Sequence, residues 1–309
     1  MKRKILISLG VFVILVVAWF FVTLVLADFD FKLVFGVDER TPDSLSYYEE
    51  IKEIQIGVAS DNVILKKTES SFVNIDYYKS KLYEYEFSVE DGILKIKQKR
   101  IRFTIFQISK SRNLEIALPG DLEKVSIGAS SGDLSLTGIS VKDLAAHTSS
   151  GDIALSALSL EIGEIHASSG SVSLNGVVAR TLDIATSSGD VTLKNVTADT
   201  GKIKASSGDF DFEDTEIKLL DLMTSSGDVT CKALVFDACE VFCSSGNVQF
   251  SLSETDAELY RLKLTTASGK ITVSGGGYNL QGSKEVNLGS GPRLLTVRVS
   301  SGNITVNYE

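Results

Sequence analysis

Residues that usually carry chemistry are scarce in this chain, whose 309 residues include two histidines and three cysteines. The two histidines lie outside any Gly-x-Ser-x-Gly elbow, and the sequence has no phosphate-binding glycine loop and no dinucleotide-binding fingerprint. Serine is abundant, but it recurs too regularly to mark one active site. We therefore predict a non-enzymatic protein, without catalytic, cofactor-binding or metal-binding residues.

Charged residues are absent from one long segment near the N-terminus. The 23 residues of 5–27 carry no charge, and they follow a basic flank of Lys2, Arg3 and Lys4. This length suits a membrane-spanning helix, and the flank favours a cytoplasmic N-terminus, with 1–4 as a cytoplasmic tip. A cleaved signal peptide is the alternative, but its apolar core is usually about 7–15 residues long. We expect a single-pass protein of the cell membrane, with its C-terminal domain extracytoplasmic.

A repeat dominates the rest of the chain. Glycines preceded by two serines recur with residue numbers that rise by 19 at each step: Gly132, Gly151, Gly170, Gly189, Gly208, Gly227 and Gly246. For the later copies, Gly269 and Gly302, the steps are 23 and then 33. A fixed period of this kind is typical of stacked repeats, in which no unit buries its apolar face alone.

Each unit of this repeat contains three short stretches in which every second residue is apolar. From one stretch to the next, the apolar positions switch between even and odd places in the repeat, so a single straight strand cannot contain them all. Alternation predicts a strand with one buried face, and each break in parity predicts a bend, as at Thr137-Gly138 and Asn175-Gly176. The pattern predicts an all-β fold, a three-sided parallel β-helix (β-solenoid) with one coil per repeat, whose strands pair with their copies about 4.8 Å away.

We divide the part after the apolar segment into four regions. They are a linker at 28–46, an irregular β cap at 47–120, regular β-helix repeats at 121–250 and irregular C-terminal coils at 251–309. Six of the nine tyrosines lie in the cap, between Tyr47 and Tyr85. We interpret them as strand packing that covers the first coil. An aromatic ligand surface is the alternative.

Aspartate or asparagine follows most of the corner glycines. Glycine accepts positive φ, and aspartate can bond its own turn amides, so the Ser-Ser-Gly-Asp corner needs no ligand. Stacked carboxylates repel, which leaves a bound cation as the alternative. Calcium-binding coils surround each ion with several oxygens, whereas each corner here offers one carboxylate. Ser171 and Asn247 also interrupt the column, and we therefore favour plain turns.

The histidines and cysteines occupy repeat positions. His147 and His166 each stand four residues before a corner glycine, and Glu164 lies on the same face as His166. Because zinc needs a third or fourth ligand in fixed geometry, we interpret the histidines as solvated neighbours and not as a metal site.

The three cysteines fall at inward positions of one coil: Cys231, Cys239 and Cys243. An odd number of inward cysteines predicts small apolar filling rather than a disulfide framework. Two of them, Cys239 and Cys243, lie about 13 Å apart along an extended strand, which is too far to bridge.

Charge limits the possible partners. The formal net charge of −9 argues against nucleic acid as a partner. One basic run interrupts the acidic background: Lys95, Lys97, Lys99, Arg100, Arg102, Lys110 and Arg112. We interpret it as a solvated strand face. The alternative is contact with anionic lipid headgroups or an anionic wall polymer.

Three segments carry a resemblance to a known family: "DGILKIKQKR", "NLEIALPGDLEKVSIGASSGDLSL" and "NLGSGPRLLTVRVSSGNITV". Together with the corner repeat, they resemble the bacterial envelope adhesin family, a domain of unknown function, over about residues 50 to 309. The resemblance implies a right-handed β-helix and a non-enzymatic domain at the cell surface, often behind a single membrane span. It implies no catalytic residues.

We therefore predict a binding or adhesion module of the bacterial cell envelope, whose partner is an envelope polymer, a lipid headgroup or a protein. A self-assembling envelope scaffold is the first alternative, because only seven residues follow Gly302 and little chain is left to cover the last coil. A β-helix carbohydrate-active enzyme is a weaker alternative. It would need long loops, and only 251–261 and 274–296 could supply them.

Overall fold

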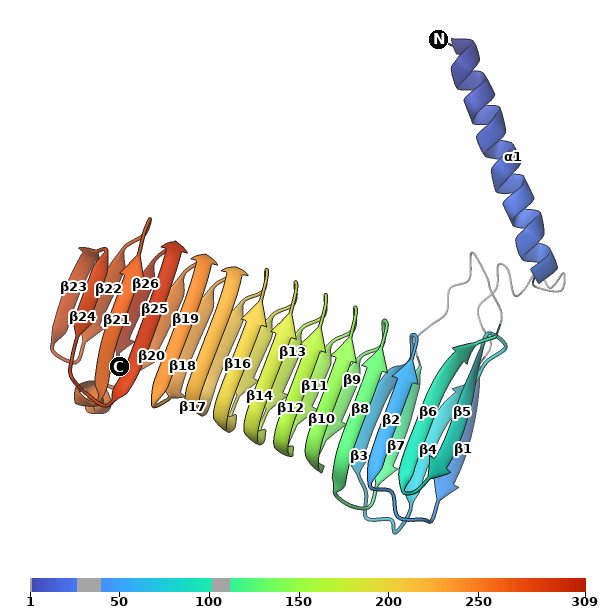
Figure 1. The fold of residues 1–309 in the computed structure, drawn as a ribbon, viewed down its shortest axis with the longest axis horizontal. Coiled ribbons are helices and arrows are strands. Elements are labelled where there is room, and N and C mark those ends of the chain that lie inside the picture. The colour runs from blue at the N-terminus through green and yellow to red at the C-terminus, as the bar shows by residue number, and fades with distance from the viewer. Residues whose placement is uncertain (1, 27–39, 102–111) are drawn as a thin grey trace.

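The computed structural model describes residues 2–26, 40–101 and 112–309. The α-helix of these ranges, α1 (Lys2–Leu26), projects from one end of a long stack of strands (Figure 1). Leu24 near its C-terminal end packs on Leu82 of the stack. None of the helices among the described residues combines the length and the hydropathy that a membrane span requires. The transmembrane role expected of 5–27 stays a prediction.

The central strands stack in chain order. They are β8 (Leu122–Ala129), β9 (Leu134–Thr137), β10 (Ser140–Thr148), β11 (Ile153–Ser156), β12 (Ser159–Ala167), β13 (Val172–Asn175), β14 (Val178–Thr186), β15 (Val191–Lys194), β16 (Thr197–Ala205), β17 (Phe210–Ser226), β18 (Val229–Val235), β19 (Ala238–Ser245) and β20 (Val248–Leu252). Each pairs in parallel with its copy one coil along, as Ile153 of β11 pairs with Val172 of β13. The predicted all-β solenoid is confirmed, and its handedness stays a prediction.

The corners lie where parity breaks. Gly138 and Gly176, at the predicted bend, have φ values of 70° and 65°. The same left-handed conformation recurs at the equivalent non-glycine positions, Ala157, Asn195, Asp214 and Ala233, with φ of 50–51°. Another corner lies inside the long strands, where the register passes from Val141↔Leu160 to Asp143↔Ile162 and skips one pair.

The corner glycines from Gly132 to Gly227 are required by stacking and not by a positive φ, which corrects the reason expected from the sequence. From Gly132 to Gly227 their φ values lie outside the left-handed region. A Cβ on Gly170 would lie 1.7 Å from the carbonyl oxygen of Gly151, and one on Gly189 would lie 1.9 Å from that of Gly170. Each coil therefore leaves no room for a side chain at the corner of the next.

The interior of the solenoid is mainly apolar, with a few buried threonines such as Thr148 and Thr186. Its largest fully buried side chains are Phe210, Phe212, Phe236 and Phe250. The three cysteines are buried and free, as predicted. Burial raises the pKa of the Cys231 and Cys239 thiols. Cys243 takes the place of an inward threonine, since its Sγ donates to the Gly227 carbonyl just as the Thr186 hydroxyl donates to the Gly170 carbonyl.

The N-terminal cap continues both long sheets. Its strands are β1 (Thr41–Tyr47), β2 (Glu53–Val58), β3 (Asn62–Lys67), β4 (Val73–Lys79), β5 (Tyr83–Glu90), β6 (Ile93–Arg100) and β7 (Asn113–Leu118). Strands β2 and β3 pair in parallel with β8 and β9, and β6 and β7 pair in parallel with β2 and β3. One sheet ends with β5, which pairs antiparallel with β6. The other sheet ends with β4, which pairs antiparallel with β7, and then β1, which pairs antiparallel with β4.

Asp61 shows why the cap differs from the coils. It occupies the corner position that glycine holds in later coils, because a Cβ on Gly132 would lie 2.0 Å from the Asp61 carbonyl oxygen. The buried Asp61 carboxylate forms an ion pair with Arg40 and accepts hydrogen bonds from the Tyr85 hydroxyl at 2.8 Å and from Gln98 Nε2 at 2.7 Å. The cap residues fill the space that a preceding corner would occupy.

The C-terminal coils do not stack in chain order. This region contains the 3-10 helix η1 (Glu254–Leu259) and β21 (Tyr260–Thr266), β22 (Ile271–Gly275), β23 (Tyr278–Ser283), β24 (Glu285–Leu288), β25 (Arg293–Ser301) and β26 (Ile304–Tyr308). The last strands insert into the stack, because β25 pairs with both β19 and β21 and β26 pairs with both β20 and β22. Antiparallel β24 and β23 cover the outer coil. The expectation of an uncovered C-terminal coil is therefore wrong.

Candidate binding groove

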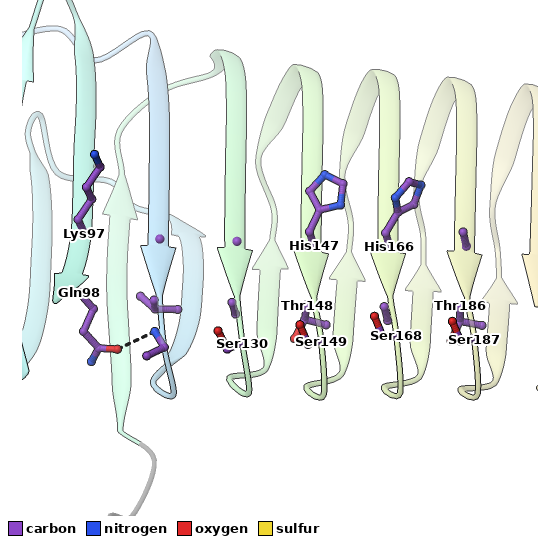
Figure 2. A pocket seen from close by; sticks show the side chains of 17 residues that line it. Lys97, Gln98, Ser130, His147, Thr148, Ser149, His166, Ser168, Thr186 and Ser187 are labelled. Atoms are coloured by element: carbon purple, nitrogen blue, oxygen red, sulfur yellow. Dashed lines mark hydrogen bonds between the residues drawn. The ribbon is translucent and has the colours of Figure 1, made fainter. Parts of the chain in front are cut away.

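A shallow groove of about 800 Å³ lies on the outer face of the sheet that joins the cap to the first coils (Figure 2). Register places one row of residues across it. Lys97 of β6 lies beside Gly57 of β2, Gly57 beside Gly128 of β8, and Gly128 beside His147 of β10. His166 of β12 continues the row. In this row, the glycines of the adjacent strands β2 and β8 form a floor without side chains. Lys97 forms the wall on one side of this floor, and His147 and His166 form the wall on the other.

The fold does not require glycine at either floor position. A Cβ on Gly57 would meet nothing within 4 Å, and a Cβ on Gly128 would meet only the Ile56 carbonyl oxygen at 4.0 Å. Both backbones lie outside the left-handed region, so an L side chain fits there without strain. Glycine inside a strand weakens the strand and often marks a close approach of another group to the backbone. These two glycines are therefore candidates for function and not for stacking.

The lower edge of the groove is polar. The exposed serines Ser130, Ser149, Ser168 and Ser187 line it in successive coils. Gln98 is held at the cap end, where its Oε1 accepts a hydrogen bond from the Ala59 amide at 2.8 Å. Hydroxyl groups both donate and accept hydrogen bonds, so this edge can meet the polar groups of a ligand.

The two histidines are neighbours, as their repeat positions predict. His147 and His166 are directly paired in the register, and their ring centroids lie 5.0 Å apart at an interplanar angle of 74°. The Nδ1 atom of His166 lies 3.8 Å from a Glu164 carboxylate oxygen. One potential ligand atom from each of these three residues lies within 4.8 Å of the other two, and this is the group in the described chain that could hold a metal ion.

Side-chain oxygens of the corner aspartates and asparagines link neighbouring coils. Each accepts a hydrogen bond from the backbone amide at the corner of the next coil, at 2.6–3.2 Å, in the pairs Asn62–Asp133, Asp133–Asp152, Asp152–Ser171, Asp190–Asp209, Asp209–Asp228, Asp228–Asn247, Asn247–Asn303 and Asn303–Lys270. The structural interpretation of this column is supported, with one correction. The amide bound belongs to the neighbouring coil and not to the residue's own turn.

The tyrosines of the cap pack mainly against one another and the core. Tyr77 lies 4.9 Å from Phe87 and 5.5 Å from Tyr85, measured between ring centroids. Burial and a hydrogen bond to Asp43 raise the pKa of Tyr77 to about 12. Tyr48 stays exposed. This arrangement matches the packing interpretation and gives no broad aromatic surface among the described residues.

Two lysines of the basic run form ion pairs with the neighbouring strand. Strand β5 pairs antiparallel with β6, and the Lys95–Glu90 and Lys99–Glu86 ion pairs measure 3.1 and 3.5 Å. Lys97 remains at the groove wall. The sequence already indicated this pairing, because Glu84, Glu86 and Glu90 precede the Asp91-Gly92 turn that leads into the basic run. Arg102 and Lys110 lie outside the described residues.

The sequence interpretation missed the floor of the groove. Gly128 stands four residues before Gly132, in the same column as the two histidines, and Gly57 stands four before Asp61. A glycine in an outward strand column was the available signal. The more numerous corner glycines obscured it.

Comparison with protein families places the fold. The Toastrack DUF4097 family matches residues 51–234, more than half of the chain. The chain belongs to this family. No curated protein matches the chain.

Solved structures resemble this member of the Toastrack DUF4097 family over most of its length. A putative lipid binding protein from Parabacteroides distasonis is 14% identical, with 87% of this chain and 98% of that chain covered and a TM-score of 0.54. A putative adhesin from the same organism is 13% identical, with 88% and 99% covered and a TM-score of 0.52. At these identities the likeness concerns the fold alone.

Proposed function

We propose that this chain is a non-enzymatic binding module, held on the extracytoplasmic side of the cell membrane, and that the groove is its ligand face. The observation that carries the proposal is the pair of exposed glycines, Gly57 and Gly128, which open a floor in the sheet although the fold needs glycine at neither position. The names of the similar structures, adhesin and lipid binding protein, support a binding role.

The chemistry of the groove favours a polar ligand with anionic groups. Lys97 supplies the positive charge of one wall, and the serine row supplies hydroxyl groups along the edge. The groove crosses several coils, so it suits an extended segment rather than a compact small molecule. An anionic envelope polymer or an anionic lipid headgroup has these features.

Membrane attachment is proposed from the sequence. The 23 uncharged residues of 5–27 and the basic flank before them support a single span with the cap and coils outside. Protease added to spheroplasts should digest the repeats and leave the N-terminus protected. A mature chain that begins at Asp28 would show cleavage instead of anchoring.

The groove is tested by filling its floor. Gly128→Tyr places a ring over the floor without a backbone conflict, because the nearest atom to its Cβ lies 4.0 Å away. Full chain reconstituted in neutral lipid nanodiscs, which keep the apolar segment 5–27 occupied, would be tested for co-sedimentation with vesicles that contain an anionic phospholipid and, in parallel, with isolated cell-wall sacculi. We expect binding to one of them, and a loss of about tenfold in Gly128→Tyr, which corresponds to about 1.4 kcal/mol.

The matched control is Met223→Tyr, which adds the same ring in the same row without a change of charge, two strands past Ala185 and beyond the groove lining. It should leave binding unchanged. Equal binding by wild type and Gly128→Tyr would show that the groove is not the ligand face. Turnover of polysaccharide abolished by one substitution would replace the proposal with an enzyme.

A self-assembling scaffold is less well supported. Its mechanism requires coil ends that stack on one another, but antiparallel strands finish both sheets at both ends. Edge strand β5 also carries the glutamates that pair with β6, and charged edges oppose strand addition.

A further inference from the structure

We propose that His147, His166 and Glu164 bind one divalent transition-metal ion, with Zn²⁺ as the expected occupant, at the histidine wall of the groove. Figure 2 shows the two imidazoles side by side on neighbouring strands and projecting from the same face. This inference does not depend on what the groove binds. It revises the expectation that the histidines are only solvated neighbours, because the structure brings Glu164 close enough to both histidines to act as a third ligand.

The backbone holds the three ligands in place. Strand β10 is paired with β8 and β12, and β12 is also paired with β14, so both histidine-bearing strands lie inside the sheet. Zinc–nitrogen distances of about 2.0–2.1 Å in a tetrahedral site separate ligand atoms by about 3.3 Å. The ligand atoms here already lie within 4.8 Å of one another. Rotation of partly exposed side chains closes the remaining distance without movement of the strands.

Charge at this position also favours a cation. Glu164 lies directly beside Asp183 in the register of β12 and β14, and beside Ala145 on β10. Like charges directly opposite each other destabilise a sheet. Neither register neighbour of Glu164 in this described part of the sheet is a lysine or an arginine, although Lys202 lies beyond Asp183.

Three other outward carboxylates of the stack have a basic partner in a neighbouring coil. Lys142–Glu123 measures 3.8 Å, Lys194–Glu213 measures 2.8 Å and Lys218–Asp199 measures 2.7 Å. Glu164 has two imidazoles in that role. A bound cation would offset the repulsion between Glu164 and Asp183, as lysines do elsewhere in the stack.

The donor set selects the class of ion. Imidazole nitrogens favour zinc, copper and nickel, whereas calcium and magnesium favour sites made of oxygen atoms. Two histidines and one carboxylate occupy three positions of a tetrahedral ion and leave the fourth open. The neighbouring row positions are Gly128 and Ala185, whose small size leaves that fourth position accessible.

The test uses the full chain in detergent without a histidine tag, since the chain itself has two histidines. Metal-free protein would be titrated with ZnCl₂ in competition with a chromophoric chelator. We expect saturation at one ion per chain, and at least about tenfold weaker binding in His147→Ala and in Glu164→Gln. Ca²⁺ and Mg²⁺ in excess should not displace the ion. Zn²⁺ should also raise the thermal unfolding midpoint of the wild type but not of His147→Ala.

Glu161→Gln is the matched control, because Glu161 is an exposed carboxylate on the same strand outside the cluster. It should bind Zn²⁺ like the wild type. His147→Gln repeats the histidine test with a larger polar side chain, in case the alanine variant alters the sheet. Binding that is absent, or that persists unchanged in both histidine variants through scattered carboxylates, would overturn the proposal.

Discussion

The regular coils and the C-terminal coils use the same corner chemistry but differ in chain order. Between β8 and β20 each coil stacks on the one that precedes it in the sequence. After β20 the final coil of the chain lies next, and the earlier coil, β21 with β22, lies outside it. The corner columns continue through this exchange: a Cβ on Gly302 would lie 1.9 Å from the Gly246 carbonyl oxygen, and one on Gly269 would lie 1.7 Å from that of Gly302. Adjacency in sequence therefore does not decide which coils stack, although the corner glycines stay in contact throughout.

The exchange gives the stack a covered end. The coil displaced to the outside is followed in the chain by β23 and β24, which pair with it antiparallel. The coil of β25 and β26 carries no such covering strands among the described residues. Placing the extended coil outside and the short coil inside buries both. Tyr308 then packs near Tyr260 and Tyr278 of the outer coil, at ring-centroid distances of 6.2 and 6.1 Å.

The largest expected effect comes from a charge between the exchanged coils. Val306 is fully buried, as is Val191 in the regular coils. We expect Val306→Asp and Val191→Asp to lower the free energy of unfolding in urea by similar amounts, about 4 kcal/mol each, because each buries an unpaired carboxylate between two coils. The outward neighbour of Val306 provides the control: Thr305→Asp, whose register partners Gln249 and Thr272 are uncharged, should change stability by no more than about 0.5 kcal/mol.

A cysteine pair separates the two possible coil orders. Ser245 and Ser301 are register partners on β19 and β25, so Ser245→Cys with Ser301→Cys should form a disulfide on oxidation. Ser245→Cys with Ser268→Cys should not, because one coil lies between them. A much smaller cost for Val306→Asp than for Val191→Asp, together with crosslinking of the second pair, would place the last coil outside.

The next effect tests the corner column itself. Gly170→Ala and Gly302→Ala should each cost about 3 kcal/mol, since a Cβ would lie 1.7 and 1.9 Å from a backbone oxygen that the stack holds in place. Gly128→Ala is the control and should stay within about 0.5 kcal/mol, because the floor of the groove has room. Thermal unfolding of the three variants measures the difference. A mild Gly302→Ala would mean that the exchanged coil is loosely seated.

The sequence was sufficient for the regular coils because their packing is local. Each apolar column and each corner glycine meets its own copy one period along the chain, so spacing alone determines the partner. The exchanged order could not be predicted in this way. The longer, unequal intervals from Gly246 to Gly269 and from Gly269 to Gly302 show that the period changes, but the partner then depends on which coil carries covering strands. The pairing of Glu164 with Asp183 follows from the 19-residue period. The floor of the groove does not, because Gly57 lies on cap strand β2, whose place beside β8 the period does not specify.

The smallest expected effect comes from a substitution that restores a missing hydrogen bond in the corner ladder, the series of hydrogen bonds between corner side chains and the backbone amides of the next coil. Asp152 Oδ1 accepts a hydrogen bond from the Ser171 amide at 2.8 Å, but the Ser171 side chain is too short to continue the ladder to Asp190. Ser171→Asn should restore that step, as Asn247 does for Asn303, and stabilise the protein by about 1 kcal/mol. Ser171→Asp should gain less at low salt, because it adds a carboxylate between Asp152 and Asp190, and the two variants should converge as salt screens the repulsion. Ser173→Asn, on the outward face of β13, is the control and should have no effect. If Ser171→Asn is also neutral in urea unfolding, the ladder follows the stacking of the coils and does not help to hold them.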